Sequence, residues 1–292
     1  RVKYDYMSEY IIRAGRVITI SGDELENAEI HIKDGIINAI GRSLDAEENV
    51  TVIDARNMTA MPGLVDAHTH LGIIEEATGM IGKDNNETSD PVTPHMRAID
   101  AVNPCDLAFN DALRAGVTTV MSGPGSNNVV GGVQAALTTY GNIIDFMIRK
   151  NPCGLKIALG ENPIMNYVKT NKSPVTRMGI AALLRELFSD TIEYMSKYKK
   201  RHDTARNLKL EAVIPIMNGE IPLRAHAHRA DDIATVIRIA SEFNISKVVI
   251  EHGTEAGLIK EYLKEKKVAV TVGPLLTPRA KMELKNRSYR TA

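Results

Sequence analysis

From residue 61 onward, short runs of β-branched and apolar residues alternate with longer segments of helical periodicity. The apolar runs predict strands at 63–70, 117–121, 155–159, 210–216, 223–228, 247–251 and 268–272. The intervening segments predict helices at about 100–115, 174–201, 231–243 and 255–265. Strands that alternate with helices are typical of parallel βαβ units, so this part of the chain is predicted to be an α/β domain.

The residues before this region have a different pattern. Short strands are predicted at 10–20, 28–33, 36–40 and 51–54, and Asp34-Gly35 between two of them predicts a β-hairpin. At roughly 150 residues per domain, a chain of 292 residues has room for about two domains. We therefore expect a small β domain at 1–60, as part of a sandwich, and a second domain at 61–292.

Charge and composition exclude several classes of protein. Basic and acidic residues number 36 each, so no strong field attracts nucleic acid, and we expect no nucleic-acid partner. No run approaches 18 apolar residues, so no membrane span is expected. Two cysteines are too few for a disulfide framework, which favours a reducing, cytoplasmic location.

Five of the eight histidines lie at the ends of predicted strands: His68, His70, His226, His228 and His252. Residues two apart on a strand share a face, so each H-x-H pair points the same way. The carboxyl ends of the strands are where α/β barrels place their active sites. Because imidazole is a common ligand of zinc and similar ions, the pattern predicts a metal site.

The segment Pro62-Gly63-Leu64-Val65-Asp66-Ala67-His68-Thr69-His70, after a small β domain, resembles the first barrel strand of the amidohydrolase superfamily. His226 and His252, the latter in Ile250-Glu251-His252-Gly253, are similar to the ligands on its fifth and sixth strands. The run 116–120 is also typical, and the imidazolonepropionase-related group is the most similar branch. The resemblance implies a (β/α)8 TIM-like barrel with one or two divalent metal ions. Zn²⁺ is the favoured ion, although Mn, Fe and Ni suit the same donors.

By this resemblance, His68 and His70 hold the more buried metal. His226 and His252 hold the second metal, or contribute to the single site in one-metal members. Two metals need a bridging carboxylate, for which the segment 154–163 offers two candidates. Lys156 could carry CO2 as a carbamate, as is frequent in the family, and Glu161 needs no modification. Strand parity slightly favours Lys156.

One family residue has no counterpart in the sequence. The resemblance requires an aspartate at the end of an eighth strand as general base, and the last predicted strand, 268–272, is followed by no such residue. An open parallel barrel would leave unpaired edges. We therefore expect the barrel to be incomplete in this chain, the chain to be a portion of a longer polypeptide, and the activity of this portion to be low.

The expected activity is hydrolysis of an amide or cyclic amide C–N bond in a small molecule by a metal-activated water. His228, on the same face as His226, is expected to contact the substrate or support the ligands. A one-metal heterocycle deaminase is the enzymatic alternative, and a non-catalytic scaffold is the alternative from a different class. Assembly into a homo-oligomer is compatible with the sequence.

Overall fold

The computed structural model describes residues 9–45, 50–200 and 205–291, and the chain divides into two units, Arg1–Leu64 and Val65–Ala292. The described part of the first unit forms a four-stranded sheet in the order β3-β2-β1-β4. Its strands are β1 (Glu9–Val17), β2 (Leu25–Lys33), β3 (Ile36–Gly41) and β4 (Thr51–Ala60). β1 pairs antiparallel with β2 and parallel with β4.

The predicted hairpin at Asp34-Gly35 is confirmed, because it joins β2 to β3 with Lys33 opposite Ile36. Both turn residues have positive φ, 52° at Asp34 and 74° at Gly35. A two-residue loop with this backbone matches the twist of the strands it connects.

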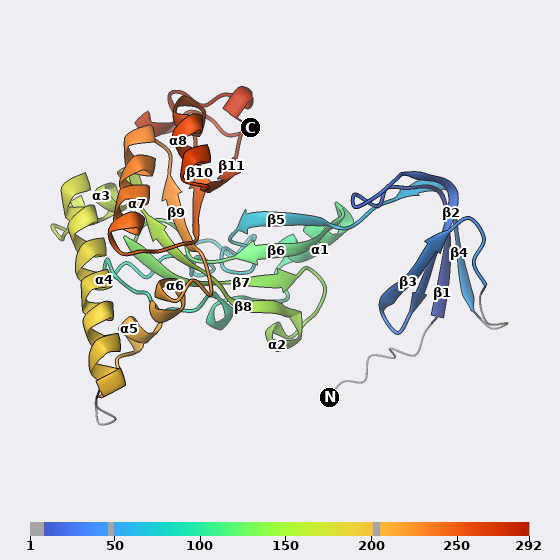
Figure 1. Cartoon of the computed structure of the whole chain (residues 1–292), viewed down its shortest axis with the longest axis horizontal. Helices are drawn as coiled ribbons and strands as arrows, with labels where there is room; N and C mark the ends of the chain where they lie inside the picture. Colours follow the sequence, from blue (N-terminus) through green and yellow to red (C-terminus); the bar gives the residue numbers. More distant parts are fainter. Residues whose placement is uncertain (1–8, 46–49, 201–204, 292) are drawn as a thin grey trace. The chain divides into compact units, whose positions relative to one another are not determined.

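The second unit contains a seven-stranded, nearly closed barrel-like sheet in the order β11-β10-β9-β8-β7-β6-β5 (Figure 1). The strands are β5 (Leu64–Thr69), β6 (Val117–Ser122), β7 (Val130–Thr138), β8 (Ile148–Ala158), β9 (Leu223–Ala227), β10 (Val248–His252) and β11 (Ala269–Val272). The predicted α/β class, with a barrel and a separate small β unit, is therefore confirmed.

The middle of this sheet differs from the predicted succession of parallel units. β7 pairs antiparallel with both β6 and β8, whereas β8, β9, β10 and β11 are parallel to one another. No strand is predicted from the sequence at 130–138, where β7 lies, and this segment contains Gly131-Gly132. Gly132 has a φ of 129°, and an added Cβ would lie 2.4 Å from the Met96 carbonyl oxygen, so the pair permits a close approach of two chain segments.

Helices and short helical turns connect and cover the strands. They are α1 (Leu107–Arg114), α2 (Ile144–Met147), α3 (Glu161–Val168), α4 (Arg177–Lys200), α5 (Leu208–Glu211), α6 (Ile214–Met217), α7 (Ala230–Glu242) and α8 (Lys260–Glu265). The 3-10 turns are η1 (Ala98–Asp100), η2 (Ala256–Ile259), η3 (Met282–Leu284) and η4 (Tyr289–Thr291).

The strand predicted at 210–216 is wrong, because α5 and α6 occupy this segment. The Asn207 side chain caps α5 by accepting from the amides of Lys209 and Leu210. Pro215 lies in the first turn of α6, where its missing N–H costs nothing. A short apolar run does not distinguish a buried strand from a buried helical turn.

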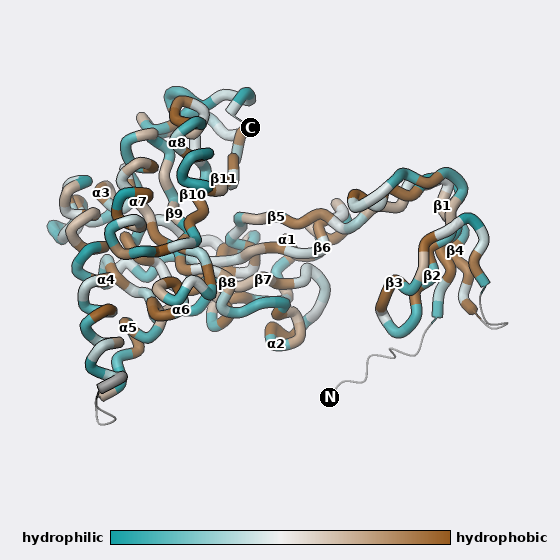
Figure 2. Tube along the Cα trace, viewed as in Figure 1, coloured by the Kyte–Doolittle hydropathy of each residue, from teal (hydrophilic) through white to brown (hydrophobic). Residues whose placement is uncertain are grey.

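Helices α4 and α7 cover the outer face of the sheet. In Figure 2, α4 changes between teal and brown along its length, as expected for a helix with one apolar face. The main core is formed by buried side chains of β8, β9, α4 and α7, including Leu155, Ile157, Leu223, Ala225, Ile180, Leu184, Phe188, Ile233, Val236 and Ile237. This packing fixes β8 and β9 from outside and leaves their inner residues for the site.

Strand β5 confirms the strand predicted from the histidine motif, but its first four residues are exposed. Leu64 and Val65 are 50% and 67% exposed. β5 lies at an edge of the described sheet, so only its carboxyl end, at Thr69, is buried.

None of the described helices has the length and apolar character needed to cross a membrane.

Candidate metal centre

Strand β9 positions two histidines by the alternation of its side chains. Ala225 and Ala227 belong to the core beneath the helices, so His226 lies on the inner face, and His228 follows directly after the strand. Both histidine side chains are at most 5% exposed. As predicted, the two histidines of this H-x-H pair lie on a common face, and the ring centroids of His226 and His228 are 4.8 Å apart.

His252 ends the neighbouring strand β10 with an irregular backbone. Ile250 lies in the core, so regular alternation would turn Glu251 inward and His252 outward. Instead His252 has a φ of 73°, and its ring lies 4.5 Å from that of His226. A positive φ at a residue other than glycine is uncommon and is frequent at functional sites. Both Glu251 and His252 therefore reach the inner face.

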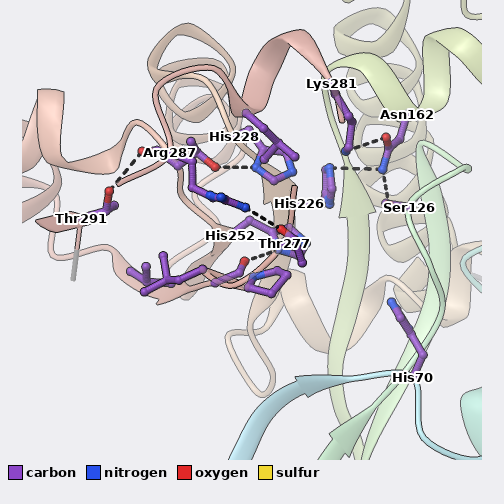
Figure 3. Close-up of a pocket in the computed structure, with 16 residues that line it drawn as sticks. His70, Ser126, Asn162, His226, His228, His252, Thr277, Lys281, Arg287 and Thr291 are labelled. Atoms are coloured by element: carbon purple, nitrogen blue, oxygen red, sulfur yellow. Dashed lines mark hydrogen bonds between the residues drawn. The ribbon is translucent and has the colours of Figure 1, made fainter. Parts of the chain in front are cut away.

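His226, His228 and His252 form a triad of candidate metal ligands (Figure 3). One ring nitrogen from each lies within 4.8 Å of the others. Bonds of about 2.1 Å from imidazole to a zinc ion span at most about 4.2 Å, so shifts of less than about 1 Å would bring all three to one ion.

Hydrogen bonds set which ring nitrogens are available. Nδ1 of His252 donates to the carbonyl oxygen of Gly273 at 2.7 Å, and Nδ1 of His70 donates to that of Gly123 at 2.7 Å. A carbonyl oxygen only accepts, so the proton is on Nδ1 and the lone pair is on Nε2. A metal-binding histidine usually donates the N–H of its other ring nitrogen, here Nδ1, to such a carbonyl oxygen.

The same histidines are neutral near pH 7. Burial lowers the pKa of His228 and His70 to about 4, and burial together with the nearby His68 lowers that of His252 to about 2. Burial also lowers the pKa of His226 well below its usual range. Metal binding needs the neutral imidazole, so no proton has to be removed at neutral pH.

Four buried side-chain nitrogen atoms have no hydrogen-bond partner in the described part of the chain, and two of them lie at or beside this cluster: Nδ1 of His226 and Nζ of Lys156. Buried polar atoms are nearly always paired, so each unpaired one calls for a water, a bound group or local strain. The three neutral histidine donors fit a divalent ion.

His68 lies close to the triad but has a different partner. Its Nδ1 is 2.6 Å from Glu251 Oε2, and Arg224 Nε donates to the other carboxylate oxygen. Arg224 also donates to the Ala67 carbonyl oxygen at 2.6 Å, which ties β9 to β5. Burial alone would raise the pKa of Glu251, but the hydrogen bonds from His68 and Arg224 lower it overall. The structure therefore places His68 beside the Glu251–Arg224 ion pair, to which it is hydrogen-bonded.

The two candidates for a bridging group differ in position. Lys156 is 1% exposed on β8, and burial lowers the pKa of its ammonium to about 8. Glu161 begins α3, and its amide donates to Glu283 Oε2 at 3.0 Å. Neither Lys156 nor Glu161 lines the histidine cavity, although Asn162 does. The charge of Lys156 is close enough to help lower the pKa values of His68, His226 and His252, so Lys156 lies nearer to the cluster's charges.

A cavity of about 260 Å³ opens over the triad. His70 reaches it from β5, and Asn162 and Lys281 reach it from α3 and the segment after β11 (Figure 3). Lys281 Nζ donates to Asn162 Oδ1 at 2.8 Å. Polar groups that converge on a small cavity suit a small-molecule ligand.

Sequence reasoning missed Glu251, Arg224, Asn162 and Glu283 at this site. Arg224 carried a signal, because it precedes His226 by two residues and shares its face. Glu251 was hidden because strand alternation assigns it the face opposite to His252. Glu283 comes from a 3-10 turn far from the predicted strand ends, and no spacing rule points to it.

The barrel-like sheet with histidines at its strand ends matches a solved structure, an amidohydrolase from Thermotoga maritima MSB8. The two are 41% identical with a TM-score of 0.92, over 96% of this chain and 73% of that one. The chain therefore belongs to the amidohydrolase superfamily.

Curated relatives support this assignment. The chain is 25% identical to the amidohydrolase tasK of Hapsidospora irregularis over 263 residues, which is 80% of this chain and 27% of that protein. A segment of 49 residues, 17% of this chain and 12% of the relative, is 53% identical to the imidazolonepropionase of Caldanaerobacter subterraneus subsp. tengcongensis. The chain spans about a quarter or less of the length of these curated relatives. No protein-family model matches it.

Proposed function

We propose that the chain binds one or two divalent metal ions and hydrolyses a C–N bond, in an amide or cyclic amide, of a small molecule. The observation that supports this most is the convergence of three neutral histidines, His226, His228 and His252, at the floor of one cavity. Zn²⁺ is the ion that we favour, because neutral imidazole nitrogens are among its preferred ligands.

The chemistry that a bound ion supplies is polarisation of the scissile bond and activation of water at neutral pH. The chain's part is to keep three histidines neutral and to orient two of them by hydrogen bonds at Nδ1, His252 to the Gly273 carbonyl oxygen and His228 to the Thr254 hydroxyl. His70, with its Nδ1 fixed by the Gly123 carbonyl oxygen, is the proposed ligand of a second ion together with His68. Glu251 contacts only Nδ1 of His68, which leaves Nε2 of this ring for an ion, as in a carboxylate–histidine–metal arrangement.

Lys156 is the proposed bridging group. Its Nζ has no hydrogen-bond partner in the described chain, and a pKa of about 8 leaves an appreciable neutral fraction near pH 7. Reaction with CO2 requires the neutral amine, so this amine is prepared for carbamate formation. Glu161 would need to turn toward the cavity to replace it.

Deamination of a heterocycle is the second candidate. The described residues contain a single triad with mutually close ligand atoms, which suits a one-metal site. The cavity offers Asn162 and Lys281 as polar groups for either type of substrate.

The first test is metal content by elemental analysis, with the protein reconstituted in the presence of bicarbonate. We expect one or two equivalents of transition metal per chain and their loss in a His226→Ala/His252→Ala double variant. A His31→Gln variant, in the other unit, is the matched control and should keep the metal.

The same samples are then assayed with amides, cyclic amides and amino-substituted heterocycles. Opening of an amide without ammonia release supports the hydrolase, and ammonia release from a heterocycle supports the deaminase. Absence of metal in the reconstituted wild-type protein would contradict both and favour the non-catalytic scaffold.

A further inference from the structure

The buried carboxylate of Glu283 lies next to the histidine triad, although it comes from a different part of the chain. Glu283 is in η3, beyond β11, and its side chain has no exposed surface. Its Oε1 atom is 3.8 Å from Nε2 of His226 and 3.8 Å from Nε2 of His228. This separation is too long for a hydrogen bond, so neither histidine is its direct partner.

The orientation of this carboxylate is fixed by its other contacts. Oε2 accepts the backbone N–H of Glu161 at 3.0 Å, and Lys281 Nζ lies 3.0 Å from Oε1. Gly160 has a φ of 88°, and an added Cβ there would lie 2.6 Å from Oε2. Only glycine allows this close approach. With Oε2 anchored, Oε1 is held toward the two histidines.

The distances suit a shared cation. Two bonds of about 2.1 Å at a tetrahedral zinc ion place the ligand atoms about 3.4 Å apart. Both 3.8 Å separations come within about 0.5 Å of this value, so small side-chain shifts would bring the three atoms to one ion. Three neutral imidazoles leave the charge of a divalent ion uncompensated, and Glu283 adds a buried negative charge, which it shares with the ammonium of Lys281.

We propose that Glu283 is a metal ligand, which gives a carboxylate oxygen to the divalent ion held by His226 and His228. This inference rests on the metal binding in the proposed function and adds a residue that the strand motifs do not contain. Lys281 then acts as a positioning residue, because its ammonium holds Oε1 in place and its second bond reaches Asn162.

The test is the affinity for Zn²⁺, measured by competition with a chromophoric chelator on metal-free protein. Glu283→Gln keeps the shape of the side chain and removes its charge, and we expect its Kd for Zn²⁺ to rise at least 10- to 100-fold. Glu265→Gln, the same change at an exposed residue paired with Lys266, is the matched control and should bind like the wild type. A Kd for folded Glu283→Gln equal to that of the wild type would overturn the proposal.

A second measurement uses Co²⁺ and the variant Glu283→Asp, which keeps the charge and shortens the side chain. A direct ligand predicts a changed visible absorption spectrum of the bound Co²⁺, and an unchanged spectrum would overturn the proposal even if Glu283→Gln failed to fold. If His226→Ala loses the metal but both Glu283 variants keep wild-type binding, only the role of Glu283 fails. If the wild type binds no metal, the proposed function fails with it.

Discussion

The histidines of β5 and those of β9 and β10 differ in their surroundings although both groups come from the same kind of motif. His68 lies on β5, a strand whose first residues are exposed. Its ring is hydrogen-bonded to Glu251 of β10. His226 on β9 is fully surrounded, and its Nδ1 has no partner in the described residues. An H-x-H sequence therefore supplies the donor atoms, and distant segments decide how each ring is held: Nδ1 of His68 by a carboxylate, and Nδ1 of His226 by no partner in the described residues.

The largest expected effect comes from breaking the network on the β5 side. Glu251→Gln leaves the buried guanidinium of Arg224 without its counter-charge and weakens the partner of His68. Removal of one member of a buried ion pair costs about 3–5 kcal/mol, so the free energy of unfolding should fall by this amount in urea titrations.

Glu242→Gln is the control for this loss, because Glu242 pairs with Arg185 at the surface and its removal should have little effect. If Glu251→Gln unfolds at the same urea concentration as the wild type, Arg224 and His68 are not held by this carboxylate, and the proposed contrast between the two histidine groups disappears.

The next prediction concerns the histidine triad and the pH dependence of stability, where the effect of each single histidine is smaller. The pKa of His228 in the folded protein is about 4 and that of His252 about 2, against 6.5 for a free histidine. Between these values the unfolded chain binds more protons than the folded one, so stability rises with pH. As pH falls from about 6.5 toward 4, the metal-free protein should lose on the order of 1 kcal/mol per pH unit for each such histidine.

Thermal unfolding at several pH values, in the presence of a chelator, measures this slope. His228→Gln should flatten the curve between pH 6.5 and 4 relative to the wild type. An equal slope in both proteins would mean that His228 titrates alike in the folded and unfolded chains and is not kept neutral by burial.

The smallest expected effect concerns the support of Glu283. Gly160→Ala adds a Cβ against Oε2 of Glu283 at a backbone conformation that favours glycine. We expect a loss of about 1–3 kcal/mol. Gly116→Ala has a similar φ of 83° but open space around its Cβ, so it should cost about 1 kcal/mol less. Equal losses in chemical denaturation would show that the contact with Glu283 contributes nothing.

The sequence is informative where local chemistry decides the structure. Asp34-Gly35 determines its hairpin by backbone conformation alone, and Ala225 and Ala227 between polar residues indicate which face of β9 is buried. The motif around His68 also indicated the family. These features depend on neighbours along the chain, which a single sequence contains.

The sequence is uninformative where distant segments decide. Arg224 and His68 share one partner, Glu251 on β10. It lies 27 residues after Arg224 and 183 residues after His68. The positive φ of His252 overrides strand alternation, and no composition rule indicates it. Glu283 reaches the triad only because the chain folds back after β11. The domain boundary, the metal ligands and the partners named from the sequence stay predictions.

The antiparallel pairing of β7 and β8 has a consequence for how the sheet assembles. Leu137 lies opposite Ile148, and the register continues to Val130 opposite Ile157. This hairpin closes a loop of about ten residues, whereas β9 must return to β8 across a connection of more than sixty. Short loops lose less chain entropy on closure. We therefore expect the strand that carries Lys156 to be paired early in folding, with the histidine strands added to an existing template.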